Sequence, residues 1–151
     1  MTANVWNDDW ESGEDWSGGG GRSKRLPRGT ELGASVYELG PENWAPLHFH
    51  HASEELLVVL RGCPILQTSQ SHRELAEGEV VHFPVGPAGA HGLKNQTAEP
   101  VRYLMVSTLK SPEVAEYPEL RQITAQAQTS SQTGPALAHP RHRRRGGVRV
   151  T

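Results

Sequence analysis

The chain has 151 residues with 15 basic and 17 acidic side chains, and its formal net charge at pH 7 is −2. This length allows one domain, and the hydrophobic content of 35% is low for a globular chain because both ends are polar. The only cysteine, Cys63, excludes an intramolecular disulfide and predicts a reducing, cytoplasmic compartment.

The first 28 residues (1–28) are predicted to form a flexible arm. They contain an acidic stretch, the four consecutive glycines Gly18–Gly21 and a basic stretch. No apolar segment follows Met1, so a secretory signal is not expected. Trp6, Trp10 and Trp16 are unusual in such a composition. Two interpretations stay open: the tryptophans dock on the domain or on a partner subunit, or the arm is extended and mobile.

Residues 29–121 are predicted to form one all-β domain, because short apolar runs alternate with turn signals and no long helical period occurs. The expected strands are Leu32–Leu39, Ala45–His50, Glu55–Leu60, Pro64–Thr68, His72–Leu75, Val80–Phe83, Ala90–Asn95 and Val101–Ser107. The segment from Ser111 to Pro118 is expected to cross away from these strands. Regular short strands favour a sandwich or a barrel.

Two alternating histidines and a carboxylate form the first half of a candidate site. His48 and His50 lie two positions apart in an expected strand, so their side chains share a face. Glu55 follows His50 by an odd number of residues, so a turn or bulge at about residues 51–53 must bring it to the same side. From Glu55 onward the strand is apolar on both faces, which is typical of a strand covered on both sides.

A fourth candidate ligand, His91, follows a segment rich in glycine and proline. Three imidazoles and one carboxylate suit a single divalent metal ion. A histidine pair alone could be a polar strand end, and Glu55 and His91 together favour a metal site. His51 has the wrong parity and is expected to face solvent, and His82 is expected to be a structural histidine.

The two segments resemble the two sequence motifs of the cupin superfamily. Gly40–Gly62 resembles G-x5-H-x-H-x3,4-E-x6-G, with the spacing before the first histidine stretched from five residues to seven. Gly78–Asn95 resembles G-x5-P-x-G-x2-H-x3-N, with four residues instead of two between Gly86 and His91. The motifs are specific in combination and weak singly.

The resemblance extends over roughly residues 32–118 and is that of a small single-domain cupin. It implies a double-stranded β-helix, the jelly-roll barrel, with a metal ion held inside. Glu55 is preferred over its neighbour Glu54, because six residues then precede the closing glycine of the first motif. The implied ligands are His48, His50, Glu55 and His91. They suit Fe, Mn, Ni, Cu, Co or Zn, and four ligands of an octahedron leave two positions open.

Two functions follow as hypotheses. The first is a metal-dependent enzyme of oxygenase, decarboxylase or isomerase type acting on a small organic molecule, with Tyr37, Tyr103 and His82 as candidate acids or bases. The alternative is a non-catalytic module that binds or senses a small ligand and contains a structural metal.

Residues 122–151 are predicted to be a disordered, arginine-rich tail. Nucleic-acid binding is not expected, because residues 28–121 contain 7 basic and 12 acidic side chains. No segment predicts membrane association. The exposed sheet edges of a jelly roll favour a homodimer.

Overall fold

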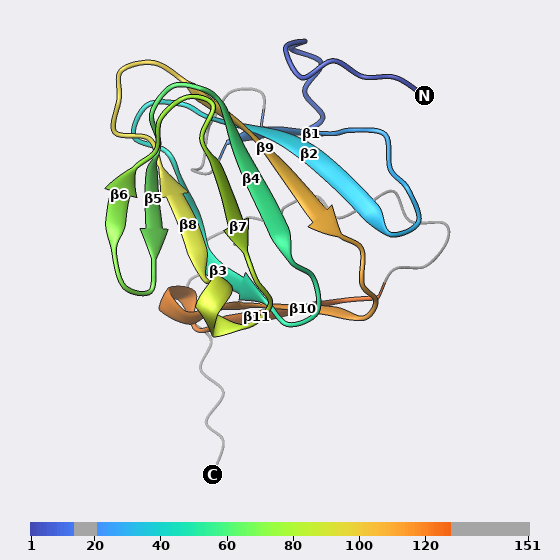
Figure 1. The fold of residues 1–151 in the computed structure, drawn as a ribbon. Coiled ribbons are helices and arrows are strands. Elements are labelled where there is room, and N and C mark those ends of the chain that lie inside the picture. The colour runs from blue at the N-terminus through green and yellow to red at the C-terminus, as the bar shows by residue number, and fades with distance from the viewer. Residues whose placement is uncertain (14–20, 128–151) are drawn as a thin grey trace, which may run out of the picture.

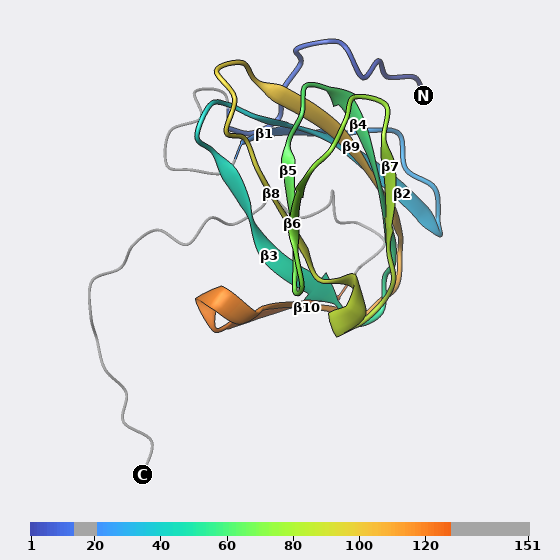
Figure 2. The same cartoon turned by 60° about the vertical axis from the view of Figure 1, so that its left-hand side comes forward.

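The computed structural model describes residues 1–13 and 21–127, and these form two antiparallel β-sheets that face each other (Figures 1 and 2). The five-stranded sheet contains, in spatial order, β1 (Arg22–Arg25), β2 (Leu32–Leu39), β9 (Val101–Thr108), β4 (Glu55–Arg61) and β7 (Val80–Phe83). The six-stranded sheet contains β11 (Gln122–Gln126), β10 (Glu113–Tyr117), β3 (Trp44–His50), β8 (His91–Lys94), β5 (Ile65–Thr68) and β6 (His72–Glu74).

This architecture is the predicted all-β jelly roll. The pairing within the described residues leaves two separate sheets instead of one closed ring of strands. The short 3-10 turns η1 (Pro87–Gly89) and η2 (Pro118–Leu120) are the only helical elements of the described part of the chain. No helix in that part is long and apolar enough to span a membrane.

The core lies between the sheets because each strand sends alternate side chains inward. In β4 the side chains of Leu57 and Val59 are buried, whereas Leu56 is 37% exposed. The predicted inward and outward faces of this strand are therefore confirmed. The largest buried cluster consists of Leu39, Leu57, Val59, Leu66, Leu75, Phe83, Leu93, Val101, Tyr103 and Met105.

All eight expected strands are present, with ends that differ by at most one residue. Three further strands, β1, β10 and β11, were not predicted. β10 occupies the segment expected to cross away from the barrel, and β11 lies within the stretch expected to be tail. The division into 1–28, 29–121 and 122–151 stays a prediction, and the tail beyond residue 127 and Trp16 lie outside the described residues.

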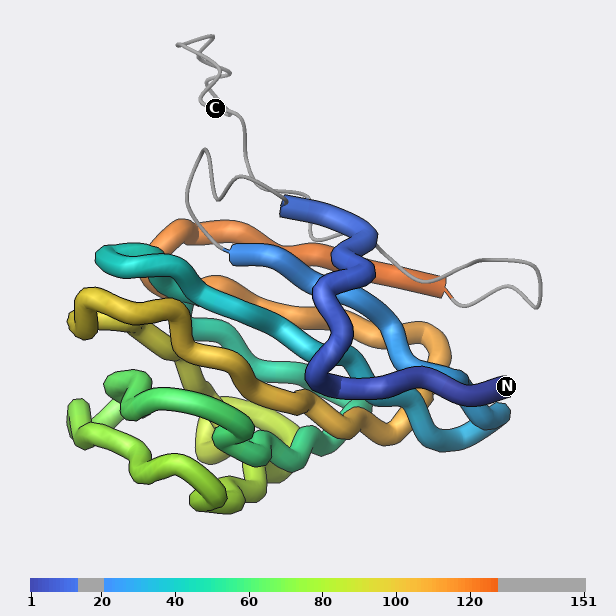
Figure 3. Tube along the Cα trace, turned by 90° about the horizontal axis from the view of Figure 1, so that it is seen from above, coloured from blue at the N-terminus to red at the C-terminus, as the bar shows by residue number. Residues whose placement is uncertain are grey.

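Residues 1–13 pack against β1 and β2, where the dark-blue tube crosses the sheet in Figure 3. The main-chain N–H groups of Glu11 and Ser12 donate to the carbonyl of Ser23, at 2.9 and 3.2 Å. The Trp10 ring lies 4.8 Å from the Arg102 guanidinium, a cation–π distance. Trp10 therefore docks on the domain, whereas Trp6 remains 49% exposed.

Candidate metal centre

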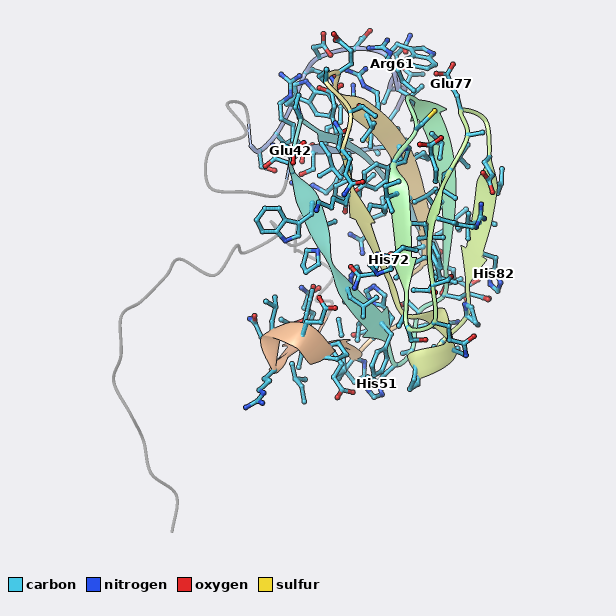
Figure 4. All side chains as sticks on the ribbon, turned by 90° about the vertical axis from the view of Figure 1, so that its left-hand side faces the viewer. Glu42, His51, Arg61, His72, Glu77 and His82 are labelled. Carbon is cyan, nitrogen blue, oxygen red and sulfur yellow. The ribbon has the colours of Figure 1, made fainter. Side chains whose placement is uncertain are left out.

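The predicted ligands come together at the end of the sandwich opposite residues 1–13. His48 and His50 end β3, Glu55 begins β4 and His91 begins β8. In Figure 4 the neighbouring His51 lies at the lower end of the molecule, whereas Arg61 and Glu77 lie at the upper end. The site thus combines groups from both sheets.

The predicted turn between the two strands is present. The chain leaves β3 after His50, whose carbonyl accepts the Gly86 N–H at 2.7 Å, and it enters β4 at Glu55. Glu54 is 52% exposed and pairs with His82 at 2.8 Å, outside the site. Glu55 is only 12% exposed and faces the histidines, so the geometry distinguishes the two adjacent carboxylates.

One carboxylate oxygen is the centre of the cluster. Glu55 Oε2 lies 3.3 Å from His50 Nε2 and 3.1 Å from His91 Nε2. Ligand atoms of His48, His50 and Glu55 all lie within 4.8 Å of one another. His91 contacts the same Glu55 oxygen without belonging to that tighter set. The second oxygen, Glu55 Oε1, accepts a hydrogen bond from Ser107 Oγ at 2.9 Å.

Main-chain carbonyls fix the orientation of two rings. His48 Nδ1 lies 2.9 Å from the Pro46 carbonyl, and His91 Nδ1 lies 2.8 Å from the Gly89 carbonyl. Because each Nδ1 then donates a proton, each Nε2 keeps its lone pair, as a metal ligand requires.

The loop before His91 accommodates the two extra residues of the second motif by forming η1. Gly89 ends this turn so close to the main chain that a Cβ on it would lie 1.8 Å from the Pro84 carbonyl oxygen. Only glycine permits that approach. The loop therefore presents the Gly89 carbonyl to His91 and sets the direction of its ring.

Aromatic rings pack against two of the histidines. Phe83 stacks on His91 with ring centroids 3.8 Å apart and planes 8° apart. Tyr117, from β10, stacks on His48 with centroids 5.2 Å apart. These contacts hold both imidazoles in place and restrict the water that reaches them.

Burial and the neighbouring charges set the protonation states. Burial and the nearby His91 lower the pKa of His48 to about 4, so this ring is neutral at pH 7. Burial acts to raise the pKa of Glu55, but the electrostatic effect of the adjacent His50 and His91 outweighs it and holds the pKa well below its ordinary value of 4.5. Burial, reinforced by the negative charge of Glu55, raises the pKa of Tyr37 to about 12. The cluster therefore combines a carboxylate with a neutral imidazole and a protonated phenol.

The donor set fits a divalent cation. Among the described residues, the buried polar atoms without a hydrogen bond include both ring nitrogens of His50, Glu55 Oε2, His91 Nε2 and Glu113 Oε2. An unsatisfied buried polar atom costs about 1–3 kcal/mol. A cation among these atoms would satisfy the Nε2 lone pairs and the carboxylate together.

The other residues named from the sequence have structural partners. His51 is exposed and pairs with Glu116 at 2.7 Å, as expected for a solvent-facing histidine. Asn95, which matches the second motif, is fully buried and donates to the carbonyls of Leu39 and Glu99. Cys63 lies at the other end, where it lines a cavity of about 590 Å³.

Sequence reasoning missed Ser107, Tyr117 and Glu113 around the site. Glu113 lies 3.8 Å from His50 Nδ1. Tyr117 and Glu113 belong to the unpredicted strand β10, and only its pairing with β3 brings them to the histidines.

Comparison with known proteins agrees with this architecture. Residues 35–107 match the family model described as the cupin domain. The chain therefore contains a cupin domain. No curated protein matches the chain.

Solved structures of similar fold include three proteins with low sequence identity. A sugar phosphate isomerase of the cupin superfamily from Silicibacter pomeroyi is 23% identical, with a TM-score of 0.59 over 74% of this chain and 83% of that protein. The polyketide cyclase RemF from Streptomyces resistomycificus is 22% identical, with a TM-score of 0.59 over 75% and 84%. KdgF from Halomonas sp. is 17% identical, with a TM-score of 0.60 over 74% and 94%. These likenesses concern the fold.

Proposed function

We propose that this protein is a metal-dependent cupin enzyme that acts on a small organic molecule. His48, His50, Glu55 and His91 hold one divalent transition metal ion, which is Fe, Mn, Ni, Cu, Co or Zn. The observation that carries this proposal is the approach of His50 Nε2 and His91 Nε2 to the same oxygen of Glu55, with no hydrogen bond made by any of the three atoms.

The side chains of the site have distinct tasks. Glu55 supplies the negative charge that attracts the cation, and Ser107 orients its carboxylate. His50 is 20% exposed and His91 only 2% exposed, so substrate reaches the site from the His50 side. When bound, the ion supplies a Lewis acid and, if it is a redox metal, an electron carrier.

The reaction is of the oxygenase, decarboxylase or isomerase type. Proteins of similar fold include a sugar phosphate isomerase and a polyketide cyclase, and these support a small organic substrate. Of the three candidate acids and bases, Tyr37 is the best supported, because it is only partly buried and because desolvation, helped by the charge of Glu55, raises its pKa. His82 pairs with Glu54 outside the site, and Tyr103 is 4% exposed in the core.

A second candidate function is a non-catalytic binding module with a structural metal. The observation that favours it is the burial of His91 beneath Phe83. Water proton relaxation of the Mn²⁺-loaded protein separates the two functions. An open coordination position gives rapid exchange of bound water and supports the enzyme, whereas a closed shell gives no enhancement and supports the module.

We further propose that the protein works as a homodimer in a reducing, cytoplasmic compartment. The edges of β6, β7 and β11, which pair with no further strand in the described part of the chain, support pairing between subunits. The free thiol of Cys63 supports the reducing environment.

The test of the metal centre is elemental mass spectrometry on protein purified without chelator or affinity metal. We expect about one equivalent of a first-row metal per chain, lost in Glu55→Ala and retained in Glu54→Ala. The adjacent carboxylate is the matched control, because Glu54 lies outside the site. If neither the native chain nor anaerobic Fe(II) reconstitution yields bound metal, the proposal is wrong.

A further inference from the structure

Glu113 is a buried carboxylate beside the site that the four-ligand set does not include. It is the first residue of β10, and its side chain is 12% exposed. β10 pairs with β3 at the end that carries the histidines, with Ala115 opposite His50. This pairing brings the Glu113 side chain to the outer edge of the His50 ring.

Two main-chain groups fix the position of the Glu113 carboxylate. Its Oε1 accepts the N–H of Val114 at 2.9 Å and that of Ala52 at 3.2 Å. Ala52 belongs to the turn that links the two strands of the site, so the same oxygen joins β10 to that turn. Glu113 Oε2 is buried and makes no hydrogen bond.

The three histidines of the site differ in what lies beyond Nδ1. His48 and His91 donate to the main-chain carbonyls of Pro46 and Gly89 at 2.9 and 2.8 Å. His50 Nδ1 makes no hydrogen bond, and a carboxylate oxygen, Glu113 Oε1, lies 3.8 Å away. This separation is too long for a hydrogen bond and short enough for direct electrostatic attraction.

We infer that Glu113 positions the His50 ring. In this role it is a carboxylate that contacts the ligating histidine and does not bind the metal itself. The inference rests on the proposed metal site. When the cation is bound, Glu113 attracts the Nδ1 proton of His50 and thereby favours the tautomer whose Nε2 lone pair points toward the cation. A carboxylate beyond a ligating histidine fixes the ring and makes it a stronger donor than a neutral carbonyl does.

The charge balance supports the same role. Glu55 alone leaves a divalent ion with one uncompensated positive charge, because a neutral imidazole contributes none. Glu113 adds the second negative charge without occupying a coordination position. The open positions then remain available for substrate, and the centre as a whole is neutral.

The competing explanation is that Glu113 only anchors the turn through Ala52 and Val114. The variant Glu113→Gln separates the two roles, because the amide oxygen still accepts those N–H groups while the negative charge is lost. Glu116→Gln is the matched control. Glu116 lies on the same strand and pairs with the exposed His51 at 2.7 Å, so it makes the same exchange outside the site.

The experiment measures the dissociation constant of Zn²⁺ for the native chain and both variants by competition with a chromophoric chelator. We expect Glu113→Gln to bind about 10–100-fold more weakly, the usual cost of removing an outer partner. Glu116→Gln should bind as the native chain does, and Glu113→Asp, which keeps the charge, should recover part of the loss. Equal affinities of the native chain and Glu113→Gln would overturn the inference and leave the proposed function intact, whereas no binding by the native chain would overturn both.

Discussion

The two ends of the sandwich both bury charged side chains, but they differ in how the buried carboxylates are paired. Glu38, at the end beside residues 1–13, is paired with Arg102, whereas Glu55, at the other end, has only histidines as ion-pair partners among the described residues. At the N-terminal end, Arg102 donates to Glu38, to Asp8 and to the carbonyls of Val5 and Trp6 at distances of 2.6–3.1 Å. At the other end, buried atoms of the glutamate and histidine cluster make no hydrogen bond.

This difference supports the proposal of a metal centre at the histidine-containing end. Buried polar groups are almost always hydrogen-bonded in folded proteins. A satisfied network is therefore explained by folding alone, whereas a cluster of unsatisfied donors and acceptors indicates a missing partner. The cavity of about 590 Å³ lies at the end beside residues 1–13, lined by Arg102, Glu38 and Cys63 among others. The cavity and the proposed metal centre thus lie at opposite ends of the molecule.

The largest expected effect is at the end of the sandwich where Arg102 pairs with Glu38. Arg102→Met should lower the free energy of unfolding by about 3 kcal/mol, because it leaves Glu38 buried with less compensation. The control Arg73→Met removes an exposed pair with Glu79 and should cost less than about 1 kcal/mol. Denaturant unfolding measures both. Metal content should not change in either variant, and equal losses of stability would show that the buried network has no special role.

The next largest effect is expected at the candidate metal centre. His91→Ala should weaken metal binding by more than about 100-fold, beyond the loss that removing an outer partner causes. His51→Ala is the control: His51 is adjacent in sequence to the proposed ligand His50, but it is exposed and pairs with Glu116, so its loss should leave binding unchanged. Chelator competition measures both. Similar losses in the two variants would overturn the ligand assignment.

A smaller effect is expected from the loop that carries His91. Gly89→Ala places a Cβ against the Pro84 carbonyl and should weaken metal binding by about tenfold, because the Gly89 carbonyl no longer orients His91. Gly78→Ala is the control. Its φ is +83° and nothing lies within 4 Å of the added Cβ, so it should cost about 1 kcal/mol of stability without affecting the metal. A comparable loss of affinity in Gly78→Ala would mean that general destabilisation, not the orientation of His91, is responsible.

The smallest effect concerns the exposed partner of Arg102. A hydrogen bond from Arg102 lowers the pKa of Asp8 below its ordinary value of 3.8. The contribution of Asp8 to the docking of residues 1–13 is therefore present above about pH 4 and is lost as the pH falls through the lowered pKa. Tryptophan emission followed to low pH should show this loss in the native chain and not in Asp8→Asn. Identical acid titrations would show that Asp8 does not hold the segment.

The local pattern of the sequence predicted most of the fold and the residues that come together in the candidate site. Alternation of apolar side chains is a property of neighbouring residues, so all eight strands between Leu32 and Thr108 were found. The same alternation placed His48 and His50 on one face. The choice of Glu55 over Glu54 followed from the spacing of the motif.

The missed elements depend on contacts between distant segments. β1 contains the basic residues Arg22 and Lys24, which a sequence pattern assigns to solvent, but the Lys24 ammonium is 3% exposed and donates to the carbonyl of Asn4 at 2.9 Å. Glu113 belongs to a polar segment in which a single carboxylate carries no signal. The alternation of Glu113, Ala115 and Tyr117 on one face was the available sign of β10.

The most direct test of the central claim is X-ray absorption spectroscopy of the Zn²⁺-loaded native chain. If the three histidines and Glu55 bind the ion, its coordination shell contains nitrogen and oxygen only, at about 2.0–2.2 Å, with the multiple scattering of three imidazoles. The opposite end of the sandwich offers Cys63 among its lining residues. A sulfur ligand at about 2.3 Å, or a shell without imidazole, would place the ion elsewhere and contradict the account.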